Sequence, residues 1–285
     1  MSQISSARPK VVALMPAWNA ERFIRPVLES LITQTYPNFY ILISDDGSTD
    51  RTAEICKDFA RRHANVDVLV QARNQGWMGN TNALLNQADG DYFFFAFHDD
   101  RPKPDYVERL VEAMEANPRA VLTFSDMIRR TGTSEPTPDD TKVYLDLEGV
   151  SDRAERGIRV ARRQGIPPSY VVTLANRGLF RASAARQVGG LRRHLAGEFA
   201  GDWPWLLHLS LIGEFVRVPE ALIEKYYPPT SLSANWRNTR WQFFGALVGC
   251  MREVRRAKLS LQEELRIQYA LIYFALQRQW RELLA

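Results

Sequence analysis

The sequence predicts an α/β protein with a mostly parallel central sheet flanked by helices, followed by a C-terminal helical extension. Two observations carry this prediction. Short apolar runs alternate with segments of helical periodicity up to about residue 125, and a β-α-β-α order favours parallel strands with helices on both faces. From Asn235 to the end, the pattern is helical throughout.

Each expected strand is a short apolar run, and each expected helix carries apolar residues three or four positions apart. Proline is expected to end the first strand at Pro16, because it donates no hydrogen bond to a sheet. The strands are predicted at Val11–Met15, Tyr40–Ile43, Val66–Val70, Tyr92–Phe97 and Ala120–Phe124. Helices are predicted around residues 23–32, 76–88 and 107–114, and another follows Asp50 with Ile55, Cys56 and Phe59 facing inward.

The second half of the chain is less regular. Residues 129–150 are polar and predict a loop or flap, and residues 151–233 carry turn signals such as Pro167-Pro168. The last helix is expected to present an apolar stripe formed by Leu265, Tyr269, Tyr273, Leu276, Trp280 and Leu283.

Length and composition limit the function classes. With 285 residues, the chain has room for one large domain or one domain with an appendage. Its net charge is only +4, and no nucleic-acid-binding motif is present, so no nucleic-acid partner is expected. The two cysteines, Cys56 and Cys250, are far apart and argue against a disulfide framework or a cysteine zinc site. No apolar run approaches the length of a membrane span, which makes the cytosol the expected location.

Polar residues follow the predicted strands. Asn19 comes after the first strand, Asp45 and Asp46 after the second, Arg73 after the third, and Asp99-Asp100 after the fourth. In open parallel sheets, ligands bind outside the carboxyl ends of the strands. The sequence therefore predicts that these side chains gather in one site.

The two acid pairs each have two interpretations. Asp45 and Asp46 suit hydrogen bonds to a base or ribose, but the same residues are natural in a turn or at a helix N-cap. Asp99 and Asp100 follow an aromatic strand, and Mg²⁺ or Mn²⁺ with a bound diphosphate would neutralise them. The alternative for that pair is a surface turn before Pro102.

Two further candidate residues, Arg73 and Asp202, also have two interpretations each. Arg73 opens a predicted helix, where it would pair with a phosphate or stack on a base, or simply face solvent. Asp202 lies beside Trp203 in a partly apolar segment, which would raise its basicity enough for a general base. The alternative for Asp202 is a helix N-cap.

Taken together, six stretches resemble glycosyltransferase family 2, whose members have the GT-A fold. They run in the family's order over about residues 10–233: VVALMPAWNAERFIRPVLESLITQTYPNFYILISDDGSTDRT, RNQG, GDYFFFAFHDD, FRASAARQVGGLR, GDWPW and VPEALIEKYYPPTSLS. The resemblance implies a catalytic domain over residues 1–233, with a nucleotide-binding half (10–125) and an acceptor or sugar half (126–233). Residues 234–285 would form a C-terminal helical extension.

The resemblance also implies roles for single residues. Pro16, Ala17 and Asn19 match the first nucleotide loop, Asp46 matches the acid that reads the base, with Asp45 beside it, and Arg73 matches a basic residue near the base or phosphate. Asp99 and Asp100 match the motif that binds the metal and the ribose-diphosphate. Asp202 matches the carboxylate that deprotonates the acceptor hydroxyl in inverting members. Residues 229–233 match a segment that closes on the diphosphate.

Three departures from the family pattern stand out. Phe97 replaces the first acid of the family's Asp-x-Asp-Asp motif, Gly201 replaces a glutamate before the base, and Pro228 replaces a histidine that serves as a metal ligand in relatives. The resemblance therefore implies a more open metal shell in this chain.

The expected activity is inverting transfer of a sugar from a nucleotide-diphosphate donor, with UDP-sugars favoured, to an acceptor hydroxyl in polysaccharide or glycoconjugate synthesis. Mg²⁺ or Mn²⁺ is the expected cofactor. A nucleotidyltransferase is the rival enzyme, but the segment 16–19 lacks the Gly-rich basic loop that such enzymes carry. A sugar-nucleotide-binding protein without catalysis is a third interpretation, which Phe97 and Pro228 keep open.

The partners are predicted only by class. A glycan, a lipid-linked sugar or another hydroxyl compound would serve as acceptor. The C-terminal helices would pack on the catalytic domain or form a homodimer. Peripheral membrane contact is the weaker alternative, because the basic and apolar residues do not segregate to opposite faces.

Overall fold

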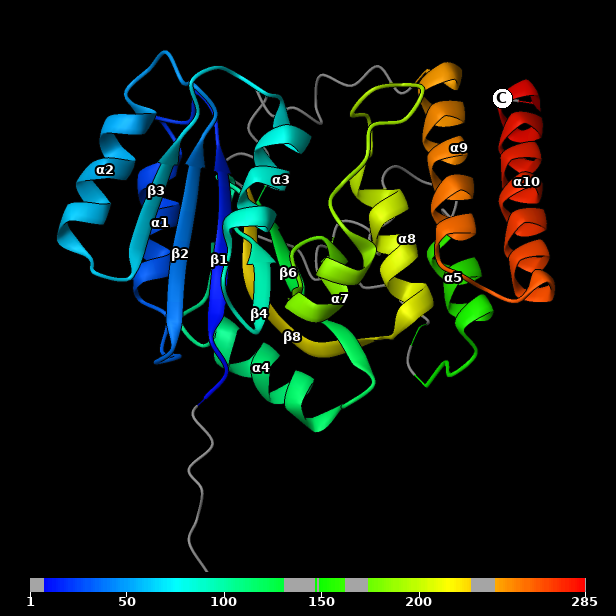
Figure 1. The fold of residues 1–285 in the computed structure, drawn as a ribbon, viewed down its shortest axis with the longest axis horizontal. Coiled ribbons are helices and arrows are strands. Elements are labelled where there is room, and N and C mark those ends of the chain that lie inside the picture. The colour runs from blue at the N-terminus through cyan, green and yellow to red at the C-terminus, as the bar shows by residue number, and fades with distance from the viewer. Residues whose placement is uncertain (1–7, 131–146, 148, 162–173, 227–238, 285) are drawn as a thin grey trace, which may run out of the picture.

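The computed structural model describes residues 8–130, 147, 149–161, 174–226 and 239–284. Figure 1 shows a sheet with helices on both sides and a pair of long helices, α9 and α10, at one end. The eight strands form one sheet in the order β3-β2-β1-β4-β7-β6-β8-β5.

The element bounds are as follows. The strands are β1 (Val11–Ala17), β2 (Phe39–Asp45), β3 (Val66–Val70), β4 (Tyr92–Phe95), β5 (Asp100–Pro102), β6 (Ala120–Arg130), β7 (Leu179–Arg181) and β8 (Glu214–Tyr226). The helices are α1 (Ile24–Ile32), α2 (Thr52–Arg62), α3 (Trp77–Gln87), α4 (Tyr106–Ala116), α5 (Arg153–Ala161), α7 (Ala182–Val188), α8 (Asp202–Ile212), α9 (Arg240–Arg256) and α10 (Leu261–Leu284).

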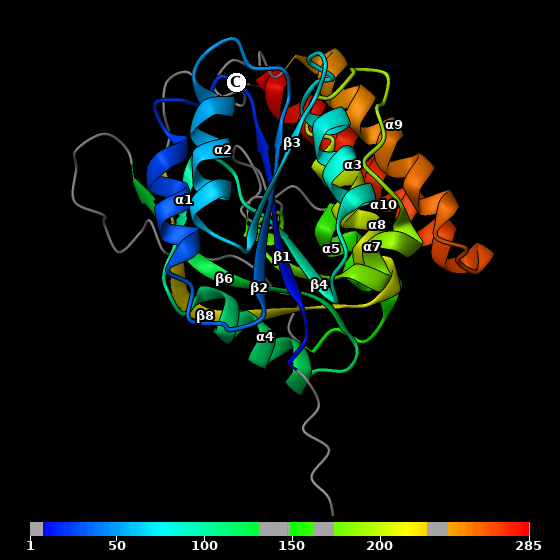
Figure 2. The same cartoon turned by 60° about the vertical axis from the view of Figure 1, so that its left-hand side comes forward.

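The first half of the sheet is parallel. β1 pairs in parallel with both β2 and β4, and β2 pairs in parallel with β3, as the alternation of strands and helices predicted. Helices α1 and α2 cover one face of these strands and α3 the other (Figure 2). Pro16 does not end β1, because the strand continues to Ala17 and pairs Pro16 with Ser44. The carboxyl ends of β1, β2 and β3 therefore reach one edge of the sheet.

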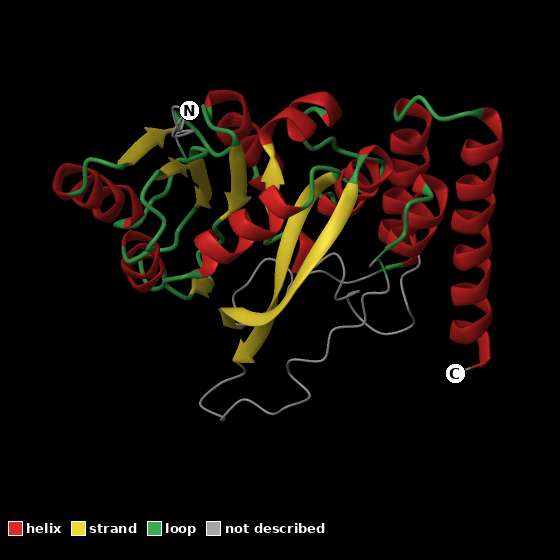
Figure 3. Ribbon diagram, turned by 90° about the horizontal axis from the view of Figure 1, so that it is seen from below, coloured by secondary structure: helices red, strands yellow, loops and turns green. Residues whose placement is uncertain are grey.

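The second half of the sheet is mixed. β7 is antiparallel to both β4 and β6, whereas β6 and β8 run in parallel with register shifts around Asp126. β6 and β8 are the long twisted strands of Figure 3. The last residues of β8 pair in antiparallel fashion with the short β5, and this register places Lys225 opposite Asp100.

The C-terminal pair packs beside α8 and α5 (Figure 1). Helix α9 begins with a capping box between Thr239 and Gln242. Helix α10 buries Ile267, Ala270 and Leu271, whereas four members of the predicted stripe, Leu265, Tyr269, Tyr273 and Leu276, are 47–73% exposed. The stripe therefore faces solvent along the described part of α10. None of the helices in the described ranges is long and apolar enough to cross a bilayer.

Candidate active site at the carboxyl edge of the sheet

The loops after β1 and β2 are held together by hydrogen bonds. Asn19, which has a left-handed backbone with φ 46°, accepts a bond from the Thr49 amide through Oδ1, and its own amide donates to Ser48 Oγ, both at 2.9 Å. Pro16 and Ala17 lie in the last two positions of β1. The three residues predicted for the first nucleotide loop thus lie at the edge of the sheet, next to the loop after β2.

The acids after β2 have different partners. Asp45 Oδ2 accepts from the Ser48 amide at 3.2 Å, and its other oxygen is buried without a hydrogen-bond partner among the described residues. Asp46 Oδ1 accepts from the Gln75 amide at 2.8 Å. Burial raises the pKa of Asp46, against the opposing effect of the Gln75 and Gly76 amides. Neither acid caps α2, which starts six residues after Asp46 at Thr52.

Asp46 thereby fixes the loop that carries Arg73. The backbone of Gly47 approaches this loop so closely that a Cβ at Gly47 would lie 3.0 Å from the carbonyl carbon of Arg73. The Arg73 side chain itself is exposed and has no ion pair with a described residue. Helix α3 follows at Trp77, as predicted, so Arg73 lies at the entry to a helix next to both acids.

The second pair of acids is matched by two basic side chains. Lys225 Nζ lies 2.6 Å from Asp99 Oδ2 and 3.7 Å from Asp100 Oδ1. Arg177 Nε lies 2.6 Å from Asp100 Oδ2. All four side chains are at most 12% exposed. Buried charges are tolerated when they are paired, so this cluster is close to electrically neutral.

The two carboxyl groups are shifted in opposite directions. Burial acts to raise the pKa of Asp99, but Lys225 and Arg177 outweigh it and hold that pKa below its usual value. Burial raises the pKa of Asp100, Arg177 and Lys225 oppose the rise, and the negative charge of Asp99 adds to it. Asp99 therefore holds the more stable negative charge of the pair.

Asp202 is joined to the same cluster through neighbouring residues. It lies in the first turn of α8, where Asn176 Nδ2 donates to its Oδ2 at 3.0 Å. Asn176 is followed directly by Arg177, which holds Asp100. One short segment thus links the acid at the start of α8 to the acids after β4.

Several of these partners were missed by the sequence reasoning, which singled out neither Lys225 nor the pair Asn176-Arg177. Nothing in the local pattern marks them, since they lie 125 and 77 residues from Asp100 in the chain. Trp18, between Ala17 and Asn19, is 52% exposed at the same edge of the sheet.

Comparison with known proteins identifies the family. The sequence pattern described as Glycosyl transferase family 2 matches residues 12–188, more than half of the chain. The chain belongs to glycosyltransferase family 2.

Relatives in this family match part of the chain. Glycosyltransferase GlyA of Streptococcus pneumoniae is 39% identical over 101 residues, which cover 35% of this chain and 14% of GlyA. The uncharacterized glycosyltransferase EpsJ of Bacillus subtilis is 36% identical over 109 residues, which cover 38% of this chain and 31% of EpsJ. The matched segments therefore span less than half of these relatives.

Solved structures share the fold over nearly the whole chain. Residues 1–349 of Staphylococcus aureus TarS, in complex with UDP-GlcNAc, align with a TM-score of 0.70 at 17% identity, covering 93% of this chain and 72% of that one. The mannosyltransferase PcManGT of Pyrobaculum calidifontis, in complex with GDP-Man and Mn²⁺, aligns at 0.65 and 17%, covering 96% and 72%. These likenesses confirm the predicted GT-A fold.

The divalent cation expected for the family was tested against the side chains present. A hard cation needs several oxygen ligands. Of the residues that the structure describes, no group of three or more His, Cys, Asp or Glu side chains could hold a metal ion. Lys225 and Arg177 already contact the carboxylates of Asp99 and Asp100. As these side chains stand, the pair does not fit a divalent cation, which would have to displace Lys225. Pro228 lies outside the described residues.

Proposed function

We propose that this member of glycosyltransferase family 2 is an inverting enzyme that transfers a sugar from a nucleotide-diphosphate donor to an acceptor hydroxyl. The observation that carries the proposal is the link from Asp202 through Asn176 and Arg177 to Asp100. This link fixes the position of a candidate base, Asp202, relative to the acids at the carboxyl edge of the sheet. Ligands of open α/β sheets bind at that edge.

The donor and acceptor are proposed by class. A UDP-sugar is favoured, since TarS has been solved with UDP-GlcNAc, although PcManGT has been solved with GDP-Man. We propose that Pro16, Ala17, Asn19, Asp45, Asp46, Arg73 and Asp99 line the nucleotide site. The acceptor is a hydroxyl of a glycan, a lipid-linked sugar or a related compound, within polysaccharide or glycoconjugate synthesis. A homodimer through the C-terminal helices is part of the same proposal.

The reaction is a single displacement. The acceptor oxygen attacks the anomeric carbon as the bond from that carbon to the diphosphate oxygen breaks, and the acceptor proton passes to the carboxylate of Asp202. One attack inverts the configuration, and no covalent sugar-enzyme intermediate is formed. Asn176 orients the carboxylate by donating to one of its oxygens. Lys225 and Arg177 balance the charge of Asp99 and Asp100, which lowers the repulsion that an incoming diphosphate would meet.

The family and the Mn²⁺ in the PcManGT complex suggest use of a divalent cation. When bound, such a cation would neutralise the leaving diphosphate. The prediction of Mg²⁺ or Mn²⁺ on Asp99 and Asp100 would require Lys225 to move away from Asp99.

Replacing Asp202 by Asn tests the base. The variant should lose transfer from its donor by about a hundredfold or more, because general-base catalysis contributes factors of that size. Its stabilisation by nucleoside diphosphates in thermal unfolding, screened with UDP, GDP, dTDP, CDP and ADP with and without Mn²⁺, should match that of the wild type. Transfer that survives in D202N would show that Asp202 is not the base.

A further inference from the structure

A concave site lies between α9 and the segment that leads from α7 into α8. It has a volume of about 320 Å³. Its wall contains Gly201, Pro204 and Trp205 from the start of α8, but Asp202 is not among the lining residues. The basic side chains that line it are Arg192, Arg193, His194, Arg252, Arg255 and Arg256. The site is called the arginine pocket below.

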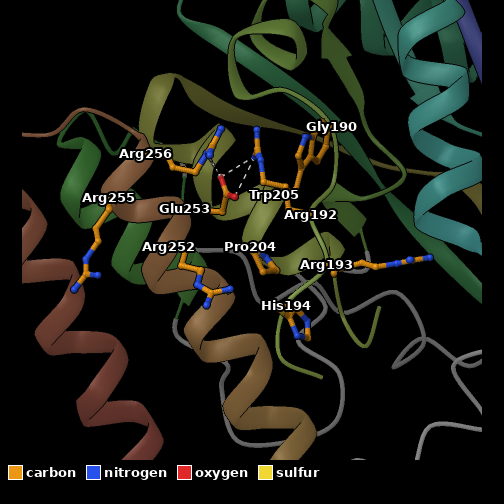
Figure 4. A pocket seen from close by; sticks show the side chains of 12 residues that line it. Gly190, Arg192, Arg193, His194, Pro204, Trp205, Arg252, Glu253, Arg255 and Arg256 are labelled. Atoms are coloured by element: carbon orange, nitrogen blue, oxygen red, sulfur yellow. Dashed lines mark hydrogen bonds and ion pairs between the residues drawn. The ribbon is translucent and has the colours of Figure 1, made fainter. Parts of the chain in front are cut away.

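A buried carboxylate fixes two of these arginines. Glu253 is almost fully buried and accepts from Arg192 Nη1 at 3.1 Å through both oxygens, and from His208 Nδ1 at 2.7 Å. Arg256 Nε lies 3.8 Å from the same carboxylate. Figure 4 shows the guanidinium groups of Arg192 and Arg256 next to the carboxylate of Glu253. Because Glu253 is held by several partners, it positions these guanidinium groups without cancelling their combined charge.

Arg252 adds a positive charge that no described residue balances through an ion pair. It is exposed, and no described residue forms a hydrogen bond or an ion pair with it. It lies one helical turn before Arg256, a spacing at which like charges repel. Figure 4 shows its side chain extending toward Pro204 and His194.

His194 supplies a neutral wall to the arginine pocket. Its Nε2 lies 2.6 Å from the carbonyl oxygen of Phe199, and its Nδ1 accepts from the Ala196 amide. Burial lowers the pKa of His194, and the positive charge of Arg252 lowers it further. The excess positive charge therefore comes from the arginines, with three guanidinium groups facing one carboxylate.

We propose that the arginine pocket binds a phosphate or diphosphate group, held by Arg192, Arg252 and Arg256. Guanidinium groups bind phosphate oxygens in pairs, and a phosphate offers more acceptor oxygens than a carboxylate does. A cavity of about 320 Å³ is large enough for such a group with a small organic substituent. The inference concerns binding and does not depend on the transferase activity.

Titration calorimetry of the full chain with inorganic pyrophosphate tests the proposal. Pyrophosphate taken up by the nucleotide site is common to the wild type and to a variant of the pocket, so the difference between the two reports on the arginine pocket. The double variant R252Q/R256Q should bind pyrophosphate at least about tenfold more weakly, since each lost bond to a charged group is worth more than a factor of ten. Its melting temperature without ligand should fall only slightly, because Arg252 has no hydrogen bond or ion pair with a described residue and Arg256 loses only its 3.8 Å contact with Glu253, which keeps Arg192 and His208.

The matched control is R61Q/R62Q, which removes the same charge from the exposed face of α2.

Vesicles of phosphatidylcholine with and without phosphatidylglycerol separate a lipid headgroup from a soluble phosphate. Binding only to the anionic vesicles, lost in R252Q/R256Q, assigns the pocket to a headgroup. Pyrophosphate binding lost in that variant assigns it to a soluble phosphate. Equal losses in both double variants, or no binding of either probe by the wild type, would overturn the proposal.

Discussion

Among single side chains, Lys225 contributes most directly to balancing the negative charges of Asp99 and Asp100. Its ammonium group lies within 2.6 Å of Asp99, and both groups are buried. Removing one partner of a buried ion pair leaves the other charge without compensation, which is far more costly than replacing both by neutral groups.

Replacing Lys225 by Met should therefore destabilise the protein by about 3–5 kcal/mol near neutral pH. Because the folded pKa of Asp99 is lowered, the pair stabilises the fold above the ordinary aspartate pKa, and this contribution is lost as pH falls through the folded pKa. The deficit of K225M in the free energy of unfolding should thus shrink on acidification below about pH 4. Urea unfolding of both proteins at pH 7 and at about pH 3, below the ordinary aspartate pKa, measures it.

The double variant D99N/K225M is the control for this prediction. It removes both charges, so it should recover part of the stability that K225M loses at neutral pH. If K225M shows the same deficit at both pH values, the ion pair is not the source of the effect.

The sequence predicted the acids of the site more readily than their partners. Asp45, Asp46, Asp99 and Asp100 follow apolar runs, a local pattern that predicts strand ends directly. Lys225 and Arg177 reach Asp99 and Asp100 only through the pairing of β8 with β5 and through the turn before β7. Contacts between residues so distant in the chain depend on tertiary pairing, which no local pattern encodes.

At the scale of elements, the two halves of the sheet also differ in how far a local sequence pattern predicts them. β1, β2, β3 and β4 are apolar runs ended by polar residues, and all four were predicted. β5 and β7 have three residues each, too few to show a period. β8 contains Pro219 and pairs across a register shift, so its alternation is broken. Sequence reasoning therefore predicted the parallel half and, in the mixed half, only the start of β6 at Ala120–Phe124.

The loop after β2 gives a prediction at this scale. Gly47 has φ +67°, and an added Cβ would lie 3.0 Å from the backbone of Arg73. Gly47→Ala should cost roughly 1–2 kcal/mol for the left-handed conformation, and a further loss from displacement of the Arg73 loop. Urea unfolding measures the stability, and nucleotide binding should weaken as the loop moves.

Gly197→Ala is the matched control for Gly47→Ala. Gly197 has a similar φ of +70°, but nothing lies within 4 Å of an added Cβ, so the variant bears the backbone strain alone. An equal loss of stability in both variants would mean that the contact with the Arg73 loop has no effect.

At the scale of the whole molecule, the C-terminal helices pack against α5 and α8 but leave the predicted apolar stripe of α10 exposed. Tyr269 is 73% exposed and Tyr273 47% exposed on α10, and their rings stack. The helical pattern correctly indicated the apolar stripe, but periodicity does not say what covers it. Helix α10 instead turns Ile267 and Leu271 toward the core, so the stripe is available to another molecule.

Dimerisation through this stripe predicts that the wild type sediments as a dimer and that Tyr269→Gln with Tyr273→Gln sediments as a monomer. Each tyrosine buried in an interface stabilises the dimer by about 25 cal/mol per Å² of apolar area removed from water. A glutamine in its place buries much less apolar area and therefore stabilises the dimer much less. Leu195→Gln is the control, since Leu195 is a comparably exposed apolar side chain in the segment before α8. A wild type that stays monomeric, or a dimer that survives the double substitution, would remove the stripe from consideration as the dimer interface. Because the substituted rings lie on the solvent face of α10, the double variant should keep the melting temperature of the monomeric fold, which separates a lost interface from a lost fold.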